Sequence, residues 1–187
     1  SIVLPDGVTS IPDGAFRECA SLTGLAIPDG VTEIGDRAFY GCTSLSELAI
    51  PAGVQTIGER AFAECASLLR IVIPDGVTAI GKEAFKNCTS LSAADIGDGV
   101  TEIPYWAFYG CSALKEITFG SSIATISEYA FSRTNVSKIN ISNLAGWLGI
   151  SVGGFSFGVH DLYLDGAKVV TLNVPQQVTS ISGIVNG

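Results

Sequence analysis

The five cysteines have the types and spacing that most directly suggest chemistry, as metal ligands, disulfides or a nucleophile. They recur every 23 residues, at Cys19, Cys42, Cys65, Cys88 and Cys111. Structural zinc sites need thiolates that converge on one point, commonly from pairs two to four residues apart. A disulfide needs Cβ atoms that approach each other, and an odd number of thiols cannot all pair. We therefore predict structural, buried cysteines, because free cysteine behaves as a small core residue.

The other candidates for catalysis are one histidine and several carboxylates. His160 precedes Asp161, but no G-x-S-x-G motif accompanies it to supply a serine nucleophile. A carboxylate pair would have to join Glu47 with Glu116 or Asp95. The intervening repeats separate these groups by about 10 to 14 Å or more, beyond the usual catalytic distance. We therefore predict that the chain is not an enzyme and has no cofactor and no metal site.

Composition and charge exclude further classes of function. The 187 residues are 47% apolar and 15% charged, with a net charge of −8, so the chain is apolar enough to fold. The acidic balance and the lack of a basic run argue against binding to nucleic acid. The longest uncharged run, residues 139–159, contains five glycines and several Asn and Ser residues. It lacks the apolar continuity of a membrane-spanning helix, so we expect no membrane insertion.

The positioning of all these side chains depends on an internal repeat. Phenylalanine recurs every 23 residues, always after alanine, at Phe16, Phe39, Phe62, Phe85, Phe108 and Phe131. Isoleucine and leucine follow the same period from Ile11 to Ile126 and from Leu22 to Leu114. We call each set of residues with this spacing a column. A unit this small cannot bury its own apolar face, so stacking is required and the period predicts a solenoid.

One unit, residues 27–49, can be read physically. The alternation Leu48, Ile50 predicts a short strand, and Pro28-Asp29-Gly30 predicts a turn. Val31 and Ile34 begin a second short extended stretch, and residues 36–39 fit one α-helical or 3₁₀ turn. The fold class is therefore a β-dominated α/β solenoid with short helical or 3₁₀ turns.

The C-terminal part departs from the repeat. Thr134 replaces the sixth cysteine, and Ile139 and Ile141 fit the strand pattern only after a deletion of one residue. Asp165-Gly166 lies between two apolar stretches, which is a strong β-hairpin signal. We expect residues 1–142 to form about six units, and residues 143–187 to form an atypical β-rich segment that is continuous with the solenoid and closes it.

The pattern AFxxC-x-x-L-x-x-I-x-IPxxVTxI, over residues 1 to about 141, resembles the BspA-like class of leucine-rich repeats. The tail is also similar to an insert found in such proteins, from Leu144-Ala145-Gly146-Trp147-Leu148 through Asp161–Gly166 to a repeat re-entry at Val174–Ile181. The resemblance implies a bacterial cell-surface or secreted protein that binds host matrix proteins or other cells without catalysis. We expect a protein ligand and a monomer. The alternative is a structural spacer in a longer surface protein.

Two surfaces are candidates for binding. Curvature of a solenoid exposes its variable strand positions in rows, which here include Glu47, Arg70, Asp95, Glu116 and Lys138. These residues are small or mixed in charge, so a merely solvated face is an equal alternative. The second candidate is Tyr105-Trp106, which replaces polar residues of other units and could join Tyr109 and Tyr129 in an exposed patch. Packing of these rings against the next coil is the other interpretation.

Overall fold

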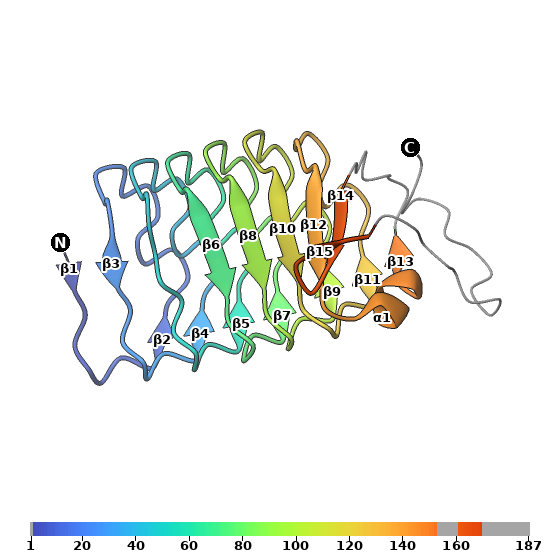
Figure 1. Cartoon of the computed structure of the whole chain (residues 1–187). Coiled ribbons are helices and arrows are strands. Elements are labelled where there is room, and N and C mark those ends of the chain that lie inside the picture. Colours follow the sequence, from blue (N-terminus) through green and yellow to red (C-terminus); the bar gives the residue numbers. More distant parts are fainter. Residues whose placement is uncertain (1, 153–160, 170–187) are drawn as a thin grey trace.

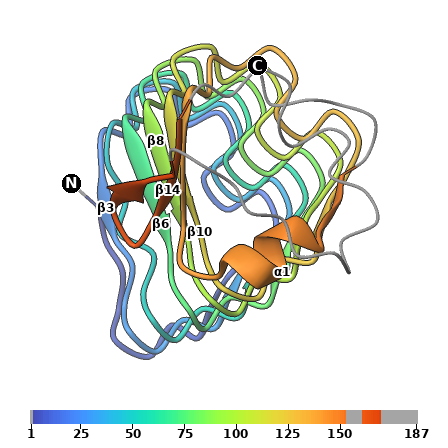
Figure 2. The same cartoon turned by 45° about the vertical axis from the view of Figure 1, so that its right-hand side comes forward.

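The computed structural model of the protein describes residues 2–152 and 161–169, which form a solenoid of about seven turns. The turns, here called coils, stack along one axis from the N-terminal to the C-terminal end (Figure 1). Viewed obliquely along that axis, successive coils follow the same path, so equivalent residues lie one behind another (Figure 2). The predicted fold class is confirmed.

Each coil contributes one strand to each of two rows. The first row, which we call the strand face, consists of β1 (Ile2–Val3), β3 (Leu25–Ala26), β6 (Arg70–Ile73), β8 (Ala93–Ile96), β10 (Glu116–Phe119), β12 (Lys138–Ile141) and β14 (Asp161–Leu164). The second row consists of β2 (Ser10–Ile11), β4 (Glu33–Ile34), β5 (Thr56–Ile57), β7 (Ala79–Ile80), β9 (Glu102–Ile103), β11 (Thr125–Ile126) and β13 (Ser151–Val152). The third coil is the exception, because its residues 45–50 follow the strand face without forming a strand. The pair β1–β3 is therefore separate from the sheet that begins at β6.

Strand register follows the sequence period. The paired strands within each row are parallel, and Arg70 pairs with Ala93 across the usual step of 23 residues. The second row is divided into two sheets between β7 and β9. Between β10 and β12 the step is one shorter, with Glu116 opposite Lys138. The predicted one-residue deletion is therefore confirmed, and it keeps Ile139 and Ile141 facing inward, because a slip of one residue would turn them outward.

A column of phenylalanines forms the core. Rings of successive coils, from Phe16 to Phe131, stack with centroids 5.1–5.3 Å apart and nearly parallel planes. Phe39, Phe62, Phe85 and Phe108 are fully buried, and the isoleucine and leucine columns surround them. Ring spacing matches strand spacing, about 4.8 Å, so one column can continue through every coil without strain.

The segment predicted as a helical turn is a different structure. In residues 37–42, Ala38, Tyr40 and Cys42 donate backbone hydrogen bonds to the residue three positions before them. The alternate residues Arg37, Phe39 and Gly41 donate instead to carbonyls of the next coil. Arg37 and Gly41 have φ values of 54° and 70°, in the left-handed region. A helix cannot form because every second N–H points along the solenoid axis rather than along the segment.

The C-terminal end contains a helix that the sequence reading missed. α1 (Leu144–Leu148) begins at Asn143, whose side chain accepts a hydrogen bond from the Gly146 N–H at 3.0 Å. Trp147 is buried against Phe119, with ring centroids 5.1 Å apart. The helix lies at the end of the stack in Figure 2. The Trp147 side chain therefore packs onto the core at the C-terminal end of the phenylalanine column.

The predicted β-hairpin is confirmed. β14 pairs in parallel with β12 and antiparallel with β15 (Ala167–Lys168). Asp165 and Gly166 form its two-residue loop, both with positive φ, as a type I′ turn requires. Val170, the repeat re-entry at 174–181 and His160 lie outside the described residues.

Replacing Phe62 by Ala is expected to lower the free energy of unfolding by about 3 to 5 kcal/mol, because it opens a cavity in the middle of the ring column. Glu59, whose side chain is 42% exposed, provides the control. Its replacement by Ala should change stability by no more than about 0.5 kcal/mol. Chemical denaturation measures both, and equal losses would contradict a core organised around the stacked rings.

Candidate binding surfaces

The cysteine column has a structural role, as the sequence predicts. All five thiols are free, and Cys42, Cys65, Cys88 and Cys111 are buried, whereas Cys19 is exposed. Each buried thiol donates a hydrogen bond to a phenylalanine carbonyl of the preceding coil, as Cys65 does to Phe39 at 3.2 Å. Within the described ranges, no group of three or more His, Cys, Asp or Glu residues is arranged to hold a metal.

Burial makes these thiols poor nucleophiles. It raises the pKa of Cys42 to about 11, and the pKa values of Cys65 and Cys88 are raised further for the same reason. The thiolate is the reactive form, so a thiol that stays protonated at neutral pH is inert. The buried thiols therefore contribute to the contact between coils, and Cys42, Cys65 and Cys88 are unsuited to act as nucleophiles.

On the strand face, the predicted charged residues pair with one another across coils. Arg70 forms an ion pair with Asp95 on the next strand. Lys138 donates to Glu116 Oε1 at 2.7 Å, and its Nζ lies 4.9 Å from the centroid of the Tyr163 ring. Glu47, in the third coil, is exposed and forms no ion pair or side-chain hydrogen bond with any residue that the structure describes.

These pairs weigh against acid–base chemistry on the strand face. Hydrogen bonds from Lys138 and Asn140 lower the pKa of Glu116, and the same bond raises the pKa of Lys138. A general acid needs a raised carboxyl pKa, and Glu116 shows the opposite. Asp95 also faces a cation rather than another carboxylate. The structure therefore brings Glu116 and Asp95 to cationic partners rather than to a joint catalytic site.

The first coils of the strand face form an apolar hollow. A depression of about 1110 Å³ extends over Gly24, Ala26 and Ala49, with Val72 and Arg70 at one side. Leu69 and Val72, 57% and 52% exposed, are among the few large apolar side chains that the described residues leave in solvent. Gly24 is equivalent to Arg70 of β6, and Ala26 and Ala49 are equivalent to Val72. Because these side chains are small, the floor of the hollow lies low. These small residues belong to the same rows of strand positions as the predicted binding residues, but the sequence analysis inferred no hollow from them.

The predicted aromatic residues gather into one cluster. Tyr105 stacks on Trp106 at 4.9 Å, Tyr129 meets Tyr105 edge-on at 5.8 Å, and Tyr109 lies 5.1 Å from Trp106. Tyr129 is exposed, whereas the other three rings are half-buried. The two interpretations, an exposed patch and packing against the next coil, therefore each describe part of the cluster. A hydrogen bond from Tyr129 to Glu128 raises the pKa of Tyr129.

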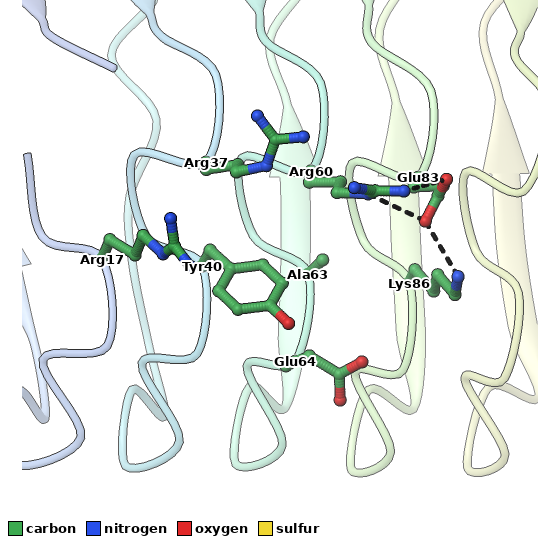
Figure 3. Close-up of a pocket in the computed structure, with 8 residues that line it drawn as sticks. All are labelled: Arg17, Arg37, Tyr40, Arg60, Ala63, Glu64, Glu83 and Lys86. Atoms are coloured by element: carbon green, nitrogen blue, oxygen red, sulfur yellow. Dashed lines mark hydrogen bonds and ion pairs between the residues drawn. The ribbon is translucent and has the colours of Figure 1, made fainter. Parts of the chain in front are cut away.

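The aromatic cluster is part of a larger surface on the outward side of the turns, which we call the turn face. Its side chains come from residues 13, 14, 17 and 18 and from their column equivalents. In its centre, Arg60 donates two hydrogen bonds to Glu83, at 3.0 and 2.8 Å, and Lys86 donates a third at 2.8 Å (Figure 3). Both cations lower the pKa of Glu83, Arg60 most. The sequence predicted only the aromatic residues of this surface, and the charged group around Glu83 was missed although its columns could be inspected in the same way as the strand rows.

Comparison with known proteins identifies the family. A model of the BspA type leucine rich repeat region, in six copies, matches residues 1–105 and 32–151. The chain therefore belongs to the BspA-type leucine-rich repeat family. The leucine-rich repeat is a protein-interaction fold, the family is generally a non-enzymatic scaffold, and no enzymatic family is indicated. Curated protein sequences give no match.

Solved structures similar to this chain are bacterial. A leucine-rich repeat protein from Bacteroides ovatus is 27% identical with a TM-score of 0.68, over 87% of this chain and 55% of that protein. The Treponema pallidum leucine-rich repeat protein is 28% identical with a TM-score of 0.58, over 67% of this chain and 71% of that one. The pneumococcal vaccine antigen PcpA is 20% identical with a TM-score of 0.71, over 88% of this chain and 41% of that protein. At this identity the similarity supports the shared fold and nothing more. This chain thus spans about half of the first relative.

No helix in the described part of the chain has the length and apolar character needed to cross a membrane.

Replacing Glu83 by Gln is expected to lower the free energy of unfolding by about 1 to 3 kcal/mol at pH 7, because Arg60 and Lys86 lose an ionised acceptor. The folded pKa of Glu83 is lowered, so this stabilisation exists above the unfolded pKa, about 4.3, and disappears as the pH falls through the folded pKa. Denaturation of both proteins between pH 7 and pH 3 measures the difference. A gap that stays constant over this range would contradict the ion-pair assignment.

The thiols should react in two classes with a disulfide reagent at pH 8. Cys19 is exposed and should react rapidly in the folded protein, whereas the four buried thiols should react only after unfolding. Spectrophotometric titration before and after adding denaturant counts them, and Cys19→Ser should abolish the rapid phase. Rapid reaction of more than one thiol in folded protein would mean that the column is open to solvent.

Proposed function

We propose that the chain is a non-enzymatic protein-binding module of a bacterial cell-surface or secreted protein, and that it mediates adhesion to host matrix proteins or other cells. The single observation that supports it best is the apolar hollow of the strand face. Folded proteins rarely leave neighbouring large apolar side chains in solvent without a binding role, and the exposed side chains of Ile2, Val3 and Val72 all line this hollow. Family membership and the bacterial neighbours support the same class of function.

The hollow suits a large apolar side chain of a partner protein. Its floor of Gly24, Ala26 and Ala49 has room for an aromatic or leucine side chain, and such anchors contribute most of the energy in protein interfaces. Glu47 and Arg70 lie at the margin, where charges set orientation and association rate more than affinity. Asp95, Glu116 and Lys138 extend this polar margin toward later coils, but their mutual pairing leaves them less available. Tyr105 and Trp106 are a second candidate surface of the same function.

The spacer remains the alternative, and one observation favours it. The charges of the later strand face neutralise each other within the molecule, as Arg70 with Asp95 and Glu116 with Lys138 do. A face built only to be solvated would show such pairing. The two functions differ in whether the hollow has an occupant.

Binding of the purified chain to immobilised extracellular matrix proteins and to host cells tests the proposal. Ala49→Arg should lower the affinity by about tenfold or more, because a long charged side chain fills the hollow without touching the core. Ala79→Arg is the matched control, since Ala79 is also exposed but lies in β7 of the second row. It should bind as the unmodified protein does.

Other outcomes assign the function differently. Loss of binding in Tyr129→Ser but not in Ala49→Arg would move the contact to the aromatic cluster. Well-folded protein that binds none of the matrix proteins or cells would contradict the adhesion proposal and favour the spacer.

A further inference from the structure

The turn face contains a socket that arises where one column lacks a long side chain. The column holds Arg17, Tyr40, Ala63, Lys86, Tyr109 and Ser132. At Ala63 the side chain ends at Cβ, and a depression of about 320 Å³ opens between the neighbouring coils. In Figure 3 the Tyr40 ring extends from its coil toward Ala63 and Glu64, and Lys86 lies on the opposite side. The socket therefore has a tyrosine on one side and an ammonium group on the other.

Cations concentrate around this socket in an otherwise acidic chain. Arg17, Arg37, Arg60 and Lys86 all line it, which is four of the ten Lys and Arg residues in a chain of net charge −8. Arg60 and Lys86 are held by Glu83. Arg37 approaches Glu59 only to 3.5 Å and is 40% exposed, so its guanidinium has donors available for a ligand.

Cations and rings alternate along the turn face beyond the socket. Arg17 lies over Tyr40 at 5.6 Å, Lys86 over Trp106 at 4.2 Å, and Arg133 over Tyr109 at 5.3 Å. The phenylalanine column gives the spacing of the coils, about 5.2 Å between successive rings. A linear ligand that runs parallel to the axis would therefore meet polar and aromatic groups at regular intervals of one coil.

We propose that the turn face binds an acidic polysaccharide, with a carboxylate or sulfate group in the socket beside Arg37 and Arg60. Guanidinium groups bind such oxyanions through paired hydrogen bonds, and tyrosine rings stack on the apolar faces of sugars. A sugar unit in a polysaccharide is similar in length to the spacing of the coils, so successive sugars meet successive coils. This ligand and this surface are distinct from the protein partner and the strand face proposed above.

The charges on this face favour a glycan over a nucleic acid. Carboxylates alternate with the cations, including Glu59 beside Arg37 and Glu64, which accepts a hydrogen bond from Asn87 at 2.7 Å. Such carboxylates would repel a phosphate at every nucleotide, but they accept hydrogen bonds from sugar hydroxyls. Hyaluronan has a carboxylate only on every second sugar, so it has fewer charges along its length than RNA and offers hydroxyls between them.

Calorimetric titration of the whole chain at low ionic strength tests the proposal with four probes. These are heparin oligosaccharides, hyaluronan oligosaccharides, neutral dextran and polyuridylate. Saturable binding of heparin or hyaluronan, weakened by salt, and none of dextran is expected. Binding of heparin alone would assign sulfate as the recognised group, and binding of hyaluronan would show that a carboxylate suffices.

Two variants and a control locate the site. Ala63→Tyr fills the socket with a residue that the same column tolerates at Tyr40 and Tyr109, and should weaken binding about tenfold or more. Arg37→Gln removes one exposed cation and should weaken it about tenfold. Lys115→Gln makes the same charge change at an exposed position on the strand face, and should alter affinity less than about twofold.

Folding of each variant is checked by circular dichroism before titration. Any one of three results would overturn the proposal. The first is that folded protein shows no saturable binding of an acidic glycan, and the second is that the unmodified protein and both variants bind with equal affinity. The third is that polyuridylate binds more tightly than either acidic glycan.

Discussion

The stacking of each coil on the next is the interaction on which the whole structure depends. A coil of 23 residues encloses too little volume to bury its own apolar side chains, so its phenylalanine, leucine and isoleucine are covered only by the equivalent residues of its neighbours. Hydrogen bonding between coils fixes their separation, and rings at 5.1–5.3 Å fit that separation. Inward positions are therefore constrained to apolar residues, in the phenylalanine column to a single type, and outward positions are not.

The turn face shows what this stacking requires of the backbone. Arg37, Arg60, Glu83, Trp106 and Tyr129 all adopt positive φ at equivalent positions. A non-glycine residue in this left-handed conformation is less stable by about 1 kcal/mol or more than the same residue in an ordinary backbone conformation. In return, alternate N–H groups reach carbonyls of the adjacent coil. The left-handed conformation also directs these side chains outward at fixed intervals, so the same hydrogen bonding that joins the coils produces an ordered outer surface.

The sequence predicted those features of the fold that depend on the spacing of residues and on local turn chemistry. The columns, the one-residue deletion before Lys138 and the Asp165-Gly166 turn follow from spacing and turn chemistry, and the structure contains them. The prediction of buried thiols holds for four of the five cysteines and is wrong for Cys19, which is exposed because its coil lies at the N-terminal end of the column. The turn segments differ because a helical turn and the observed ladder need the same residue types, and only the neighbouring coil decides between them. α1 was missed because its stability comes from the contact of Trp147 with Phe119 rather than from helix propensity.

The surfaces were less predictable for a related reason. Interior columns can be recognised in the sequence because similar apolar residues recur at every period. A binding surface in a solenoid forms instead where the residue type of an outward column changes. Both depressions arise in this way, since Gly24, Ala26 and Ala49 precede Arg70 and Val72 on the strand face, and Ala63 stands between Tyr40 and Lys86 on the turn face. A small residue removes volume without disturbing the stack beneath it. Recognition sites in such a fold can therefore appear or move by single substitutions at outward positions, while the stability of the coils stays with the inward columns.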